Sequence, residues 1–352
     1  MLISSTRYNL AAVKLHYSIL VRNVLCTTPL TLYFIHLHML AIKKLTGNTT
    51  IFDREIRLMG NRFEIQIVAN DPIWANEQID SAINEINRVE KLLSAFTEDS
   101  IINQINRNAG IKPVYVNAEI FGLIDRALQI STLTHGTFDI TYAATGKSNT
   151  AADYRETATA VKTLKRKLSL TNYTNVVLDA AEQTVYLKNK GMRIGFGAIS
   201  RGYAADRAKF ILQMQGVGSG VINAGGDLLA WGLQPDNEPW TIAAVDHSQA
   251  RQPFAGINIS NMAVATSFNT ENMSSDVPAK DINAENGFPV SHIKSVSIIT
   301  PTAEMADAMA TPVISMGVNA GLYLINKLNQ IACIIVDDHG RTYTSKDIDK
   351  LM

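Results

Sequence analysis

The stretch RFEIQIVANDPIWANEQIDSAINEINRVEKLLSA, residues 62–95, contains both periodicities of a layered protein. Apolar Phe63, Ile65 and Ile67 alternate with polar residues, which is the period of a half-buried strand. From about residue 74 the apolar residues recur instead every three or four positions, which predicts an amphipathic helix. We therefore predict a strand followed directly by a helix that packs on a sheet.

The rest of the chain mixes helical and strand patterns without strict alternation. Helical patterns occur near residues 118–131, 201–214, 303–316 and 321–328. Strand patterns occur near residues 176–178, 185–187, 219–224, 240–245, 262–265, 296–299 and 331–336. This order favours an α+β fold, with mixed or antiparallel sheets packed against helices, over a regular doubly wound sheet.

The composition and the missing motifs exclude several classes of function. Lys+Arg and Asp+Glu both number 32, so the net charge is zero and gives no global attraction toward nucleic acid. The two cysteines, Cys26 and Cys333, fit neither a disulfide framework nor a metal cluster. The sequence has no G-x-S-x-G, H-E-x-x-H or G-x-x-x-x-G-K-[ST] pattern, which argues against a serine hydrolase elbow, a zincin and a Walker-type nucleotide site.

The N-terminal part of the chain differs from the rest. Residues 24–42 contain no Lys, Arg, Asp or Glu, as in a membrane anchor or an uncleaved signal. Pro29 within this stretch argues against an anchor, and a start at Met39 would remove most of it. We expect residues 1–50 to be an N-terminal extension, either an anchor or a spurious segment, and residues 51–350 to form the functional domain.

The segment GFGAISRGYAAD, residues 195–206, places glycines and alanines just before and inside the start of a predicted helix. The amides of a helix N-terminus attract phosphate, and Arg201 adds a charged group at the same place. The glycine spacing differs from the dinucleotide fingerprint G-x-G-x-x-G. The segment is therefore either a phosphate site or a glycine turn that only permits tight packing.

The segment INAGGD, residues 222–227, runs from a predicted strand into two glycines and a carboxylate. Gly225 and Gly226 permit positive φ or the close approach of a ligand. Asn223 and Asp227 carry oxygens that can bond polar ligand atoms. A plain Gly-Gly turn without a ligand explains the same residues equally well.

The segment ADAMAT, residues 306–311, belongs to a helical pattern. Asp307 and Thr311 are four residues apart, so both side chains project from one face of the helix. A carboxylate, a hydroxyl and a nearby backbone carbonyl are hard oxygen donors that suit Mg²⁺. The alternative is that Thr311 bonds back to its own helix while Asp307 faces solvent.

Taken in order, these segments resemble the FAD:protein FMN transferase family, also called the ApbE family. The resemblance covers roughly residues 57–337, and its motifs are LMGNRFEI, SAFTEDSIINQIN, GTFDIT, the segment with RGYAAD, NAGGD, AVATS and ADAMATPVISMG. The family implies two lobes around an FAD cleft. The positions that match its flavin pocket are Met59, Phe96, Thr137, Phe138, Asp139 and Gly195, and we add Arg201, Asn223, Gly225 and Gly226 as candidate FAD contacts.

The resemblance also implies a reaction. Ala198, through its carbonyl, matches the family's Mg²⁺ site together with Asp307 and Thr311. The implied activity is Mg²⁺-dependent transfer of FMN from FAD to a Ser or Thr hydroxyl of an acceptor protein, with release of AMP. Arg201 would act near the phosphate, and Asp307 could also accept the hydroxyl proton. An FAD pyrophosphatase and a non-catalytic flavin-binding protein are the alternatives.

The chain departs from the family pattern at several positions. The family's His-containing run H-I-x-D-P-x-x-G reads KDINAENG here, with Lys280 in place of the His. Phe268 replaces the Gly of the family's T-S-G triplet, and Arg201 stands where Lys is usual. We expect FAD and Mg²⁺ binding with reduced or altered activity. Family habit suggests the bacterial cell envelope, on the periplasmic side of the inner membrane, whereas a start at Met39 suggests the cytoplasm.

Overall fold

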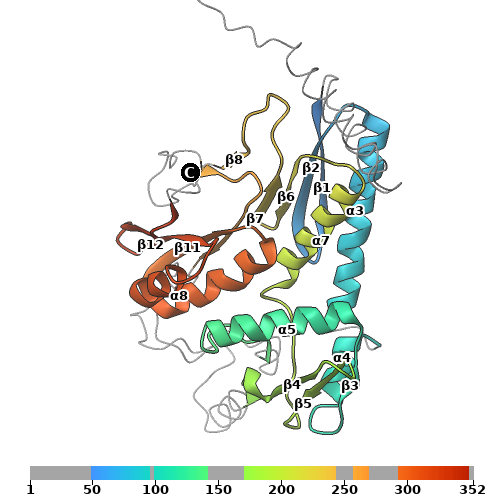
Figure 1. The fold of residues 1–352 in the computed structure, drawn as a ribbon, viewed down its shortest axis with the longest axis vertical. Coiled ribbons are helices and arrows are strands. Elements are labelled where there is room, and N and C mark those ends of the chain that lie inside the picture. Colours follow the sequence, from blue (N-terminus) through green and yellow to red (C-terminus); the bar gives the residue numbers. More distant parts are fainter. Residues whose placement is uncertain (1–48, 96–98, 142–169, 243–256, 269–291, 349–352) are drawn as a thin grey trace, which may run out of the picture. The chain divides into compact units, whose positions relative to one another are not determined.

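An eight-stranded sheet organises the part of the chain that carries the predicted site (Figure 1). The computed structural model describes residues 49–95, 99–141, 170–242, 257–268 and 292–348. The chain divides into two units, Met1–Thr49 and Thr50–Met352, and every described helix and strand belongs to the second. The predicted anchor stretch, Phe96 and the run that begins at Lys280 lie outside the described residues.

All neighbouring strands of this sheet run antiparallel, in the order β1-β2-β6-β7-β10-β11-β12-β13. Hairpins join β1 to β2 and β6 to β7, and Phe63 pairs with Ala224, so both hairpin turns lie at the same end of the sheet. The strands are β1 (Thr50–Leu58), β2 (Asn61–Ala69), β6 (Gly220–Ala224), β7 (Asp227–Trp231), β10 (Ala263–Phe268), β11 (Ile293–Thr300), β12 (Ala332–Asp337) and β13 (Thr342–Thr344).

Side chains along the central strands alternate between two apolar clusters, because successive residues of a strand point to opposite faces. On β11, Ile298 belongs to the large cluster that contains the long helices, whereas Ile299 belongs to a smaller cluster. The smaller cluster also contains Trp240 and residues of two short strands, β8 (Thr241–Ile242) and β9 (Ile257–Asn258). Both faces of the sheet are therefore covered by apolar side chains.

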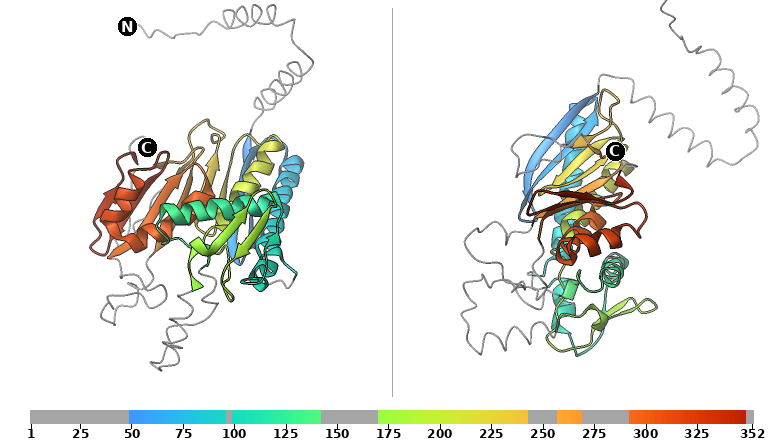
Figure 2. Two further views of the ribbon diagram at one scale, coloured as in Figure 1. Left: turned by 60° about the horizontal axis from the view of Figure 1, so that its bottom comes forward. Right: turned by 90° about the vertical axis from the view of Figure 1, so that its left-hand side faces the viewer.

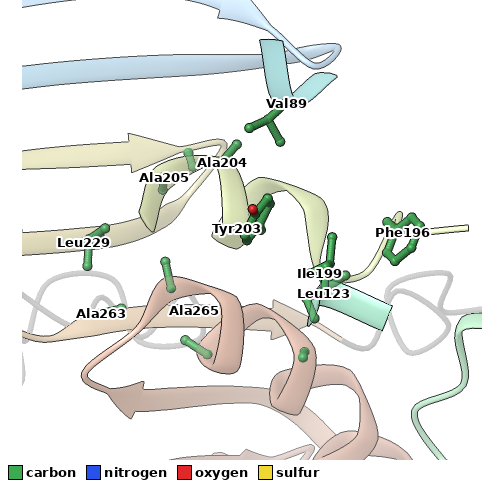
Figure 3. Packing of buried hydrophobic residues seen from close by; sticks show 14 of the residues in the cluster. Val89, Leu123, Phe196, Ile199, Tyr203, Ala204, Ala205, Leu229, Ala263 and Ala265 are labelled. Atoms are coloured by element: carbon green, nitrogen blue, oxygen red, sulfur yellow. The ribbon is translucent and has the colours of Figure 1, made fainter. Parts of the chain in front are cut away.

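Three long helices pack on the sheet: α3 (Pro72–Leu93), α7 (Ser200–Met214) and α8 (Ala303–Ile325) (Figure 2). Helix α7 contacts both α3 and α8, and the small side chains of Ala204 and Ala205 let it lie close to its neighbours (Figure 3). This packing brings the first turn of α7 against the first turns of α8. The segments with RGYAAD and ADAMAT therefore meet in space although about a hundred residues separate them.

A smaller three-stranded sheet, in the order β3-β5-β4, is formed by strands that precede α7 in the sequence. The side chain of Asn106 joins this part to the chain just before residues 195–206, which we call the glycine segment. It accepts from Ile194 N at 2.7 Å and donates to Ile194 O at 3.1 Å. The elements of this part are α4 (Ile101–Arg107), β3 (Val114–Tyr115), α5 (Ala118–Leu133), the 3₁₀ helix η3 (Tyr173–Asn175), β4 (Val176–Asp179) and β5 (Thr184–Leu187).

The predicted α+β class is confirmed, and all strand pairs among the described residues are antiparallel. The two helices predicted near residues 303–316 and 321–328 form one element, α8, with a break at Gly317, where φ is 81° and ψ is 171°. The resemblance also led us to expect two lobes. The smaller and the larger sheet both lie in the unit Thr50–Met352, within which the two lobes stay a prediction.

Gly202 is the closest point between α7 and α8. A Cβ atom added there would lie 2.2 Å from the carbonyl oxygen of Ala303, which is backbone and cannot move aside cheaply. We expect Gly202→Ala to lower the free energy of unfolding by about 1–3 kcal/mol because it forces the helices apart. Urea unfolding measures this, with Gly218→Ala as the control, since a Cβ at Gly218 meets nothing within 4 Å. Equal destabilisation by both would contradict this packing.

Candidate active site

Arg201 lies in the first turn of α7 and contacts two carboxylates from different elements. Its Nη2 atom is 3.2 Å from Asp227 Oδ2 and 3.2 Å from Asp307 Oδ1. Asp227 begins β7 directly after the Gly-Gly turn, and Asp307 lies near the start of α8. We call these three residues the Asp-Arg-Asp cluster. With both carboxyls ionised it carries a net charge of −1, because one guanidinium faces two carboxylates.

Backbone amides hold the second oxygen of each carboxylate in the Asp-Arg-Asp cluster. Gly202 N donates to Asp307 Oδ2 at 3.3 Å, and Thr266 N donates to Asp227 Oδ1 at 3.3 Å. Both carboxyl side chains are only 8% exposed. The alternative in which Asp307 faces solvent is therefore wrong, and the predicted meeting of the glycine segment with Asp307 is found.

The surroundings of the two carboxyls disfavour their ionised forms. Burial and, to a smaller extent, the nearby charge of Asp307 raise the pKa of Asp227 to about 6, against the opposing effect of Arg201. Burial also raises the pKa of Asp307, against the opposing effects of Arg201 and the Gly202 amide. Because a cation favours the ionised form of a carboxyl, added positive charge would stabilise both groups. The Asp-Arg-Asp cluster is thus a place where a further cation is favourable.

The Ser267 hydroxyl at the end of β10 lies beside α8. Ser267 Oγ is 3.3 Å from Thr311 Oγ1, so the Thr311 side chain faces the end of β10. Thr266 Oγ1 is 2.8 Å from Ser297 Oγ across the β10–β11 pair. Thr311 and Asp307 therefore project toward the same edge, as their spacing predicted.

The hairpin turns with Met59 and with the two glycines are neighbours. Gly225 N donates to Arg62 O at 2.9 Å, directly after the β1–β2 turn. Asn223 Oδ1 accepts from Gly226 N at 2.8 Å, so this side chain shapes the turn itself. Gly225 and Gly226 have φ values of +72° and +107°, as glycine permits. The turn leads straight into Asp227, so it shares one edge of the sheet with the Asp-Arg-Asp cluster.

The predicted flavin-pocket run Thr137, Phe138 and Asp139 lies beside the glycine segment, because Gly195 N donates to Ile140 O at 2.9 Å. The Asp139 carboxylate accepts from Thr141 N at 2.7 Å and Tyr173 N at 2.9 Å, which fixes the run against η3. Phe138 is only 4% exposed. Its ring therefore belongs to the core and offers little surface for stacking on a flavin.

The bend before α7 is open. Ala198 and Gly197 are exposed, and Ile199, the N-cap residue of α7, makes no side-chain hydrogen bond to the helix. The bend comes three residues before Arg201 and so lies near the Asp-Arg-Asp cluster. An exposed carbonyl suits a cation, whereas the partly positive N-terminus of α7 and the Arg201 guanidinium suit an anionic, phosphate-bearing ligand.

The donor set fits Mg²⁺ better than a transition metal. Within the described ranges, no three His, Cys, Asp or Glu side chains lie close enough to hold a metal ion together. Asp307, the Thr311 hydroxyl and a backbone carbonyl would supply only oxygen atoms. Mg²⁺ keeps several waters and takes its other ligands from one or two carboxylates and a phosphate, which matches such a sparse set.

The buried carboxyls predict a dependence of stability on pH. Burial raises the folded-state pKa of Asp206 and of Asp227 from 3.8 to about 6. The folded chain therefore favours the protonated forms, so the stability they contribute is full below about pH 4 and is lost as the pH rises through 6. We expect the free energy of unfolding without metal to fall by about 2–3 kcal/mol per carboxyl between pH 4 and pH 7.5.

Urea unfolding in EDTA between pH 5 and pH 7.5 measures most of this fall in the free energy of unfolding. Asp227→Asn should remove part of the slope, whereas Asp53→Asn on the exposed face of β1 should leave it unchanged. An Asp227→Asn curve parallel to that of the wild type would rule out the assignment to Asp227.

Sequence reasoning missed how several residues act together. It identified Arg201 and Asp227 separately but not their contact, and it gave no role to Ser267. The AVATS motif contains Ser267 and was the available signal, whereas no local pattern reports a contact between α7 and β7.

Comparisons with known proteins show the family of the chain. The model of the ApbE family matches residues 59–335. The chain is 24% identical over 319 residues to the FAD:protein FMN transferase of Treponema pallidum, covering 84% of this chain and 87% of that protein. It is 26% identical over 295 residues to an FAD:protein FMN transferase of Klebsiella pneumoniae, covering 82% and 90%.

Solved structures show the same fold. The flavin transferase ApbE of Vibrio cholerae superposes with a TM-score of 0.73 at 20% identity, covering 86% of this chain and all of that one. The ApbE protein of Thermotoga maritima gives a TM-score of 0.72 at 25% identity, covering 86% of this chain and 99% of that one.

Proposed function

Because the chain belongs to the ApbE family, we propose that it is an FAD:protein FMN transferase. It moves the FMN half of FAD onto a Ser or Thr hydroxyl of an acceptor protein and releases AMP. The observation that carries this proposal is the Asp-Arg-Asp cluster, in which one guanidinium pairs with two buried carboxylates at the first turn of α7. This arrangement provides a binding place for an anionic ligand and, next to it, one for a cation.

FAD would bind along the edge of the sheet where the two hairpin turns meet α7. Met59, Asn223 and the two glycines would contact the dinucleotide from the turns. The run that starts at Thr137 and Gly195 would contact it from the side of the smaller sheet. The N-terminus of α7 and the Arg201 side chain would bind the pyrophosphate, because the helix dipole is partly positive there and the guanidinium carries a full positive charge.

Mg²⁺ would be held by Ala198 O, Asp307 and Thr311. The net negative charge of the Asp-Arg-Asp cluster and its oxygen donors support this fit. When bound, Mg²⁺ neutralises charge that develops on the pyrophosphate. No other step in the proposal depends on the ion.

The reaction itself is a displacement at the FMN phosphorus. The acceptor hydroxyl oxygen forms a new bond to that phosphorus while the bond to the bridging oxygen breaks, and AMP leaves with the electron pair. Asp307 is placed to accept the hydroxyl proton, and Arg201 stabilises charge on the phosphate oxygens. Positioning of the two reactants supplies most of the acceleration in such transfers.

Two departures from the family pattern, Arg201 and Phe268, lie within the described part of the site. Phe268 ends β10, is 46% exposed and follows Ser267, whose hydroxyl contacts Thr311. Because successive residues of a strand point to opposite faces, the Phe268 ring lies on the other face of the sheet from Ser267 and Thr311. We hypothesise that this large exposed ring changes which acceptor segments fit, or slows transfer, without removing FAD binding.

The test of the proposed function is an incubation of the full chain with FAD and Mg²⁺, with and without a flavin-acceptor protein. In-gel flavin fluorescence of the acceptor together with AMP release is the expected result. Release of FMN and AMP without labelling of the acceptor would identify an FAD pyrophosphatase instead. Binding of FAD with Mg²⁺ but no AMP in either condition would show a non-catalytic flavin-binding protein.

The location of the protein in the cell is a separate part of the proposal. Among the described helices, α8 alone is long and apolar enough to cross a membrane, but it packs on the sheet and carries Asp307. We place the protein at the cell envelope on account of residues 24–42. Membrane fractionation of the full chain, beside a chain that starts at Met39, tests this. Recovery of both in the soluble fraction would favour the cytoplasm.

A further inference from the structure

The N-terminus of α8 is capped by a carboxylate from another helix. Asp206 of α7 accepts from Ala303 N at 2.9 Å through Oδ1 and from Glu304 N at 2.8 Å through Oδ2. Thr302, the N-cap residue of α8 itself, makes no side-chain hydrogen bond to the helix. The free amides at the start of a helix need acceptors, so Asp206 supplies what the local sequence does not.

The same face of α7 also contacts Asp307. Gly202 lies one helical turn before Asp206, and its amide donates to Asp307 Oδ2 at 3.3 Å. Ala303 and Asp307 are likewise one turn apart on α8. Two consecutive turns of α7 therefore contact two consecutive turns of α8, and this double contact fixes how far α8 can slide or rotate.

A third helix supports the same turn of α8. Arg126 of α5 forms a two-pronged ion pair with Glu304, with distances of 2.7 and 2.9 Å. The Glu304 side chain thus pairs with a guanidinium, while its backbone amide donates to the Asp206 carboxylate. The Arg126 pair is at the surface, with the Arg126 side chain 46% exposed, whereas the Asp206 contact is part-buried, so the ion pair holds α8 less firmly.

We propose that Asp206 is a positioning residue of the active site. It holds the first turn of α8 on α7, so that Asp307 and Thr311 keep the relative placement needed to bind a divalent cation with the FAD pyrophosphate. This inference rests on the proposed function, because it assigns Asp206 a part in the same site without contact to substrate. Partners that orient metal ligands typically change metal affinity 10- to 100-fold when they are removed.

The test compares two helix caps of the same chemistry. Asp71 caps α3, where its carboxylate accepts from Ile73 N at 2.8 Å and Trp74 N at 3.1 Å, and α3 carries none of the predicted site residues. Asp206→Ala and Asp71→Ala are both expected to lower the melting temperature, by about 2–4 °C for a typical cap. Calorimetric titration of Mg²⁺ into the FAD-loaded full chain separates them. Asp206→Ala should weaken Mg²⁺ binding about 10-fold or more, whereas Asp71→Ala should not.

Hydrogen exchange gives an independent readout of the same contact. Amide exchange at the start of α8 should accelerate in Asp206→Ala but not in Asp71→Ala. Asp206→Asn keeps one acceptor oxygen and should weaken Mg²⁺ binding by an intermediate factor, about threefold. This variant carries the test if Asp206→Ala does not fold.

The possible failures are distinguishable. Equal Mg²⁺ affinity in the Asp206 variants and in Asp71→Ala, with a wild type that binds Mg²⁺ and FAD, would overturn the role of Asp206 alone. A wild type that binds no Mg²⁺ in the presence of FAD would overturn the proposed metal site and this inference with it.

Discussion

Asp307→Ala is expected to lower the rate of AMP release from FAD in the presence of acceptor protein by at least about 100-fold. A metal ion contributes several kcal/mol to stabilisation of the transition state, and each 1.36 kcal/mol corresponds to a factor of ten in rate. Asp307 supplies the only carboxylate of the proposed metal site and is also the proposed acceptor of the hydroxyl proton. Its loss should therefore affect kcat more than the KM for FAD. Chromatographic measurement of AMP checks the rate.

The isosteric variant Asp307→Asn separates catalysis from stability. It keeps the shape of the side chain and should lose activity as Asp307→Ala does. It also removes a buried charge that raises the pKa of Asp227, so the melting temperature near pH 7.5 should stay the same or rise. Retained AMP release in Asp307→Asn would exclude Asp307 as metal ligand and as base.

Arg201→Ala should cause the largest loss of stability among the substitutions in the site. It leaves Asp227 and Asp307 buried without their guanidinium, and breaking a buried ion pair costs about 3–5 kcal/mol. Both carboxyls have raised pKa values in the folded chain. The loss should therefore be smaller near pH 5, where Asp227 binds a proton, and should grow as the pH rises toward 7.5.

Urea unfolding in EDTA at the two pH values measures this loss, and Mg²⁺ should restore part of it because the ion replaces the missing positive charge. Arg54→Ala is the control, since Arg54 pairs with exposed Asp80 on α3, and it should show little change at either pH. Arg201→Lys keeps the charge but not the planar fork, so it should recover part of the stability. A loss for Arg201→Ala that is independent of pH would contradict the roles given to the two carboxyls.

Local patterns predicted those elements whose apolar faces are fully buried. Helix α3 buries Ile79, Ile83 and Ile86 at three- and four-residue steps, so its period was visible in the sequence. Strand β1 was missed because it is an edge strand in which Asp53 and Glu55 are exposed and Arg54 pairs with α3. Its alternation is correspondingly weak.

The break at Gly317 explains why two helices were predicted in place of one element. At Gly317 the backbone has a positive φ and is not helical. Helix α8 is nevertheless one element that includes this kink. The two predicted helices therefore correspond to the parts of α8 before and after the kink at Gly317.

The candidate site was predictable only in part. The spacing of Asp307 and Thr311 indicated a shared helix face, because a helix fixes the direction of residues four apart. The bond from Arg201 to Asp227 and the cap that Asp206 provides for α8 join segments far apart in the sequence. Such contacts depend on how α7 and α8 pack on the sheet, which no local period encodes.

The central claim is that FMN transfer occurs at Asp307 with a divalent cation. In-gel flavin fluorescence of an acceptor protein, after incubation with FAD and Mg²⁺, compares the wild-type chain with Asp307→Asn most directly. We predict a labelled acceptor with the wild type, and no label with Asp307→Asn or when EDTA replaces Mg²⁺. Equal labelling by the two chains would contradict the assignment of the active site.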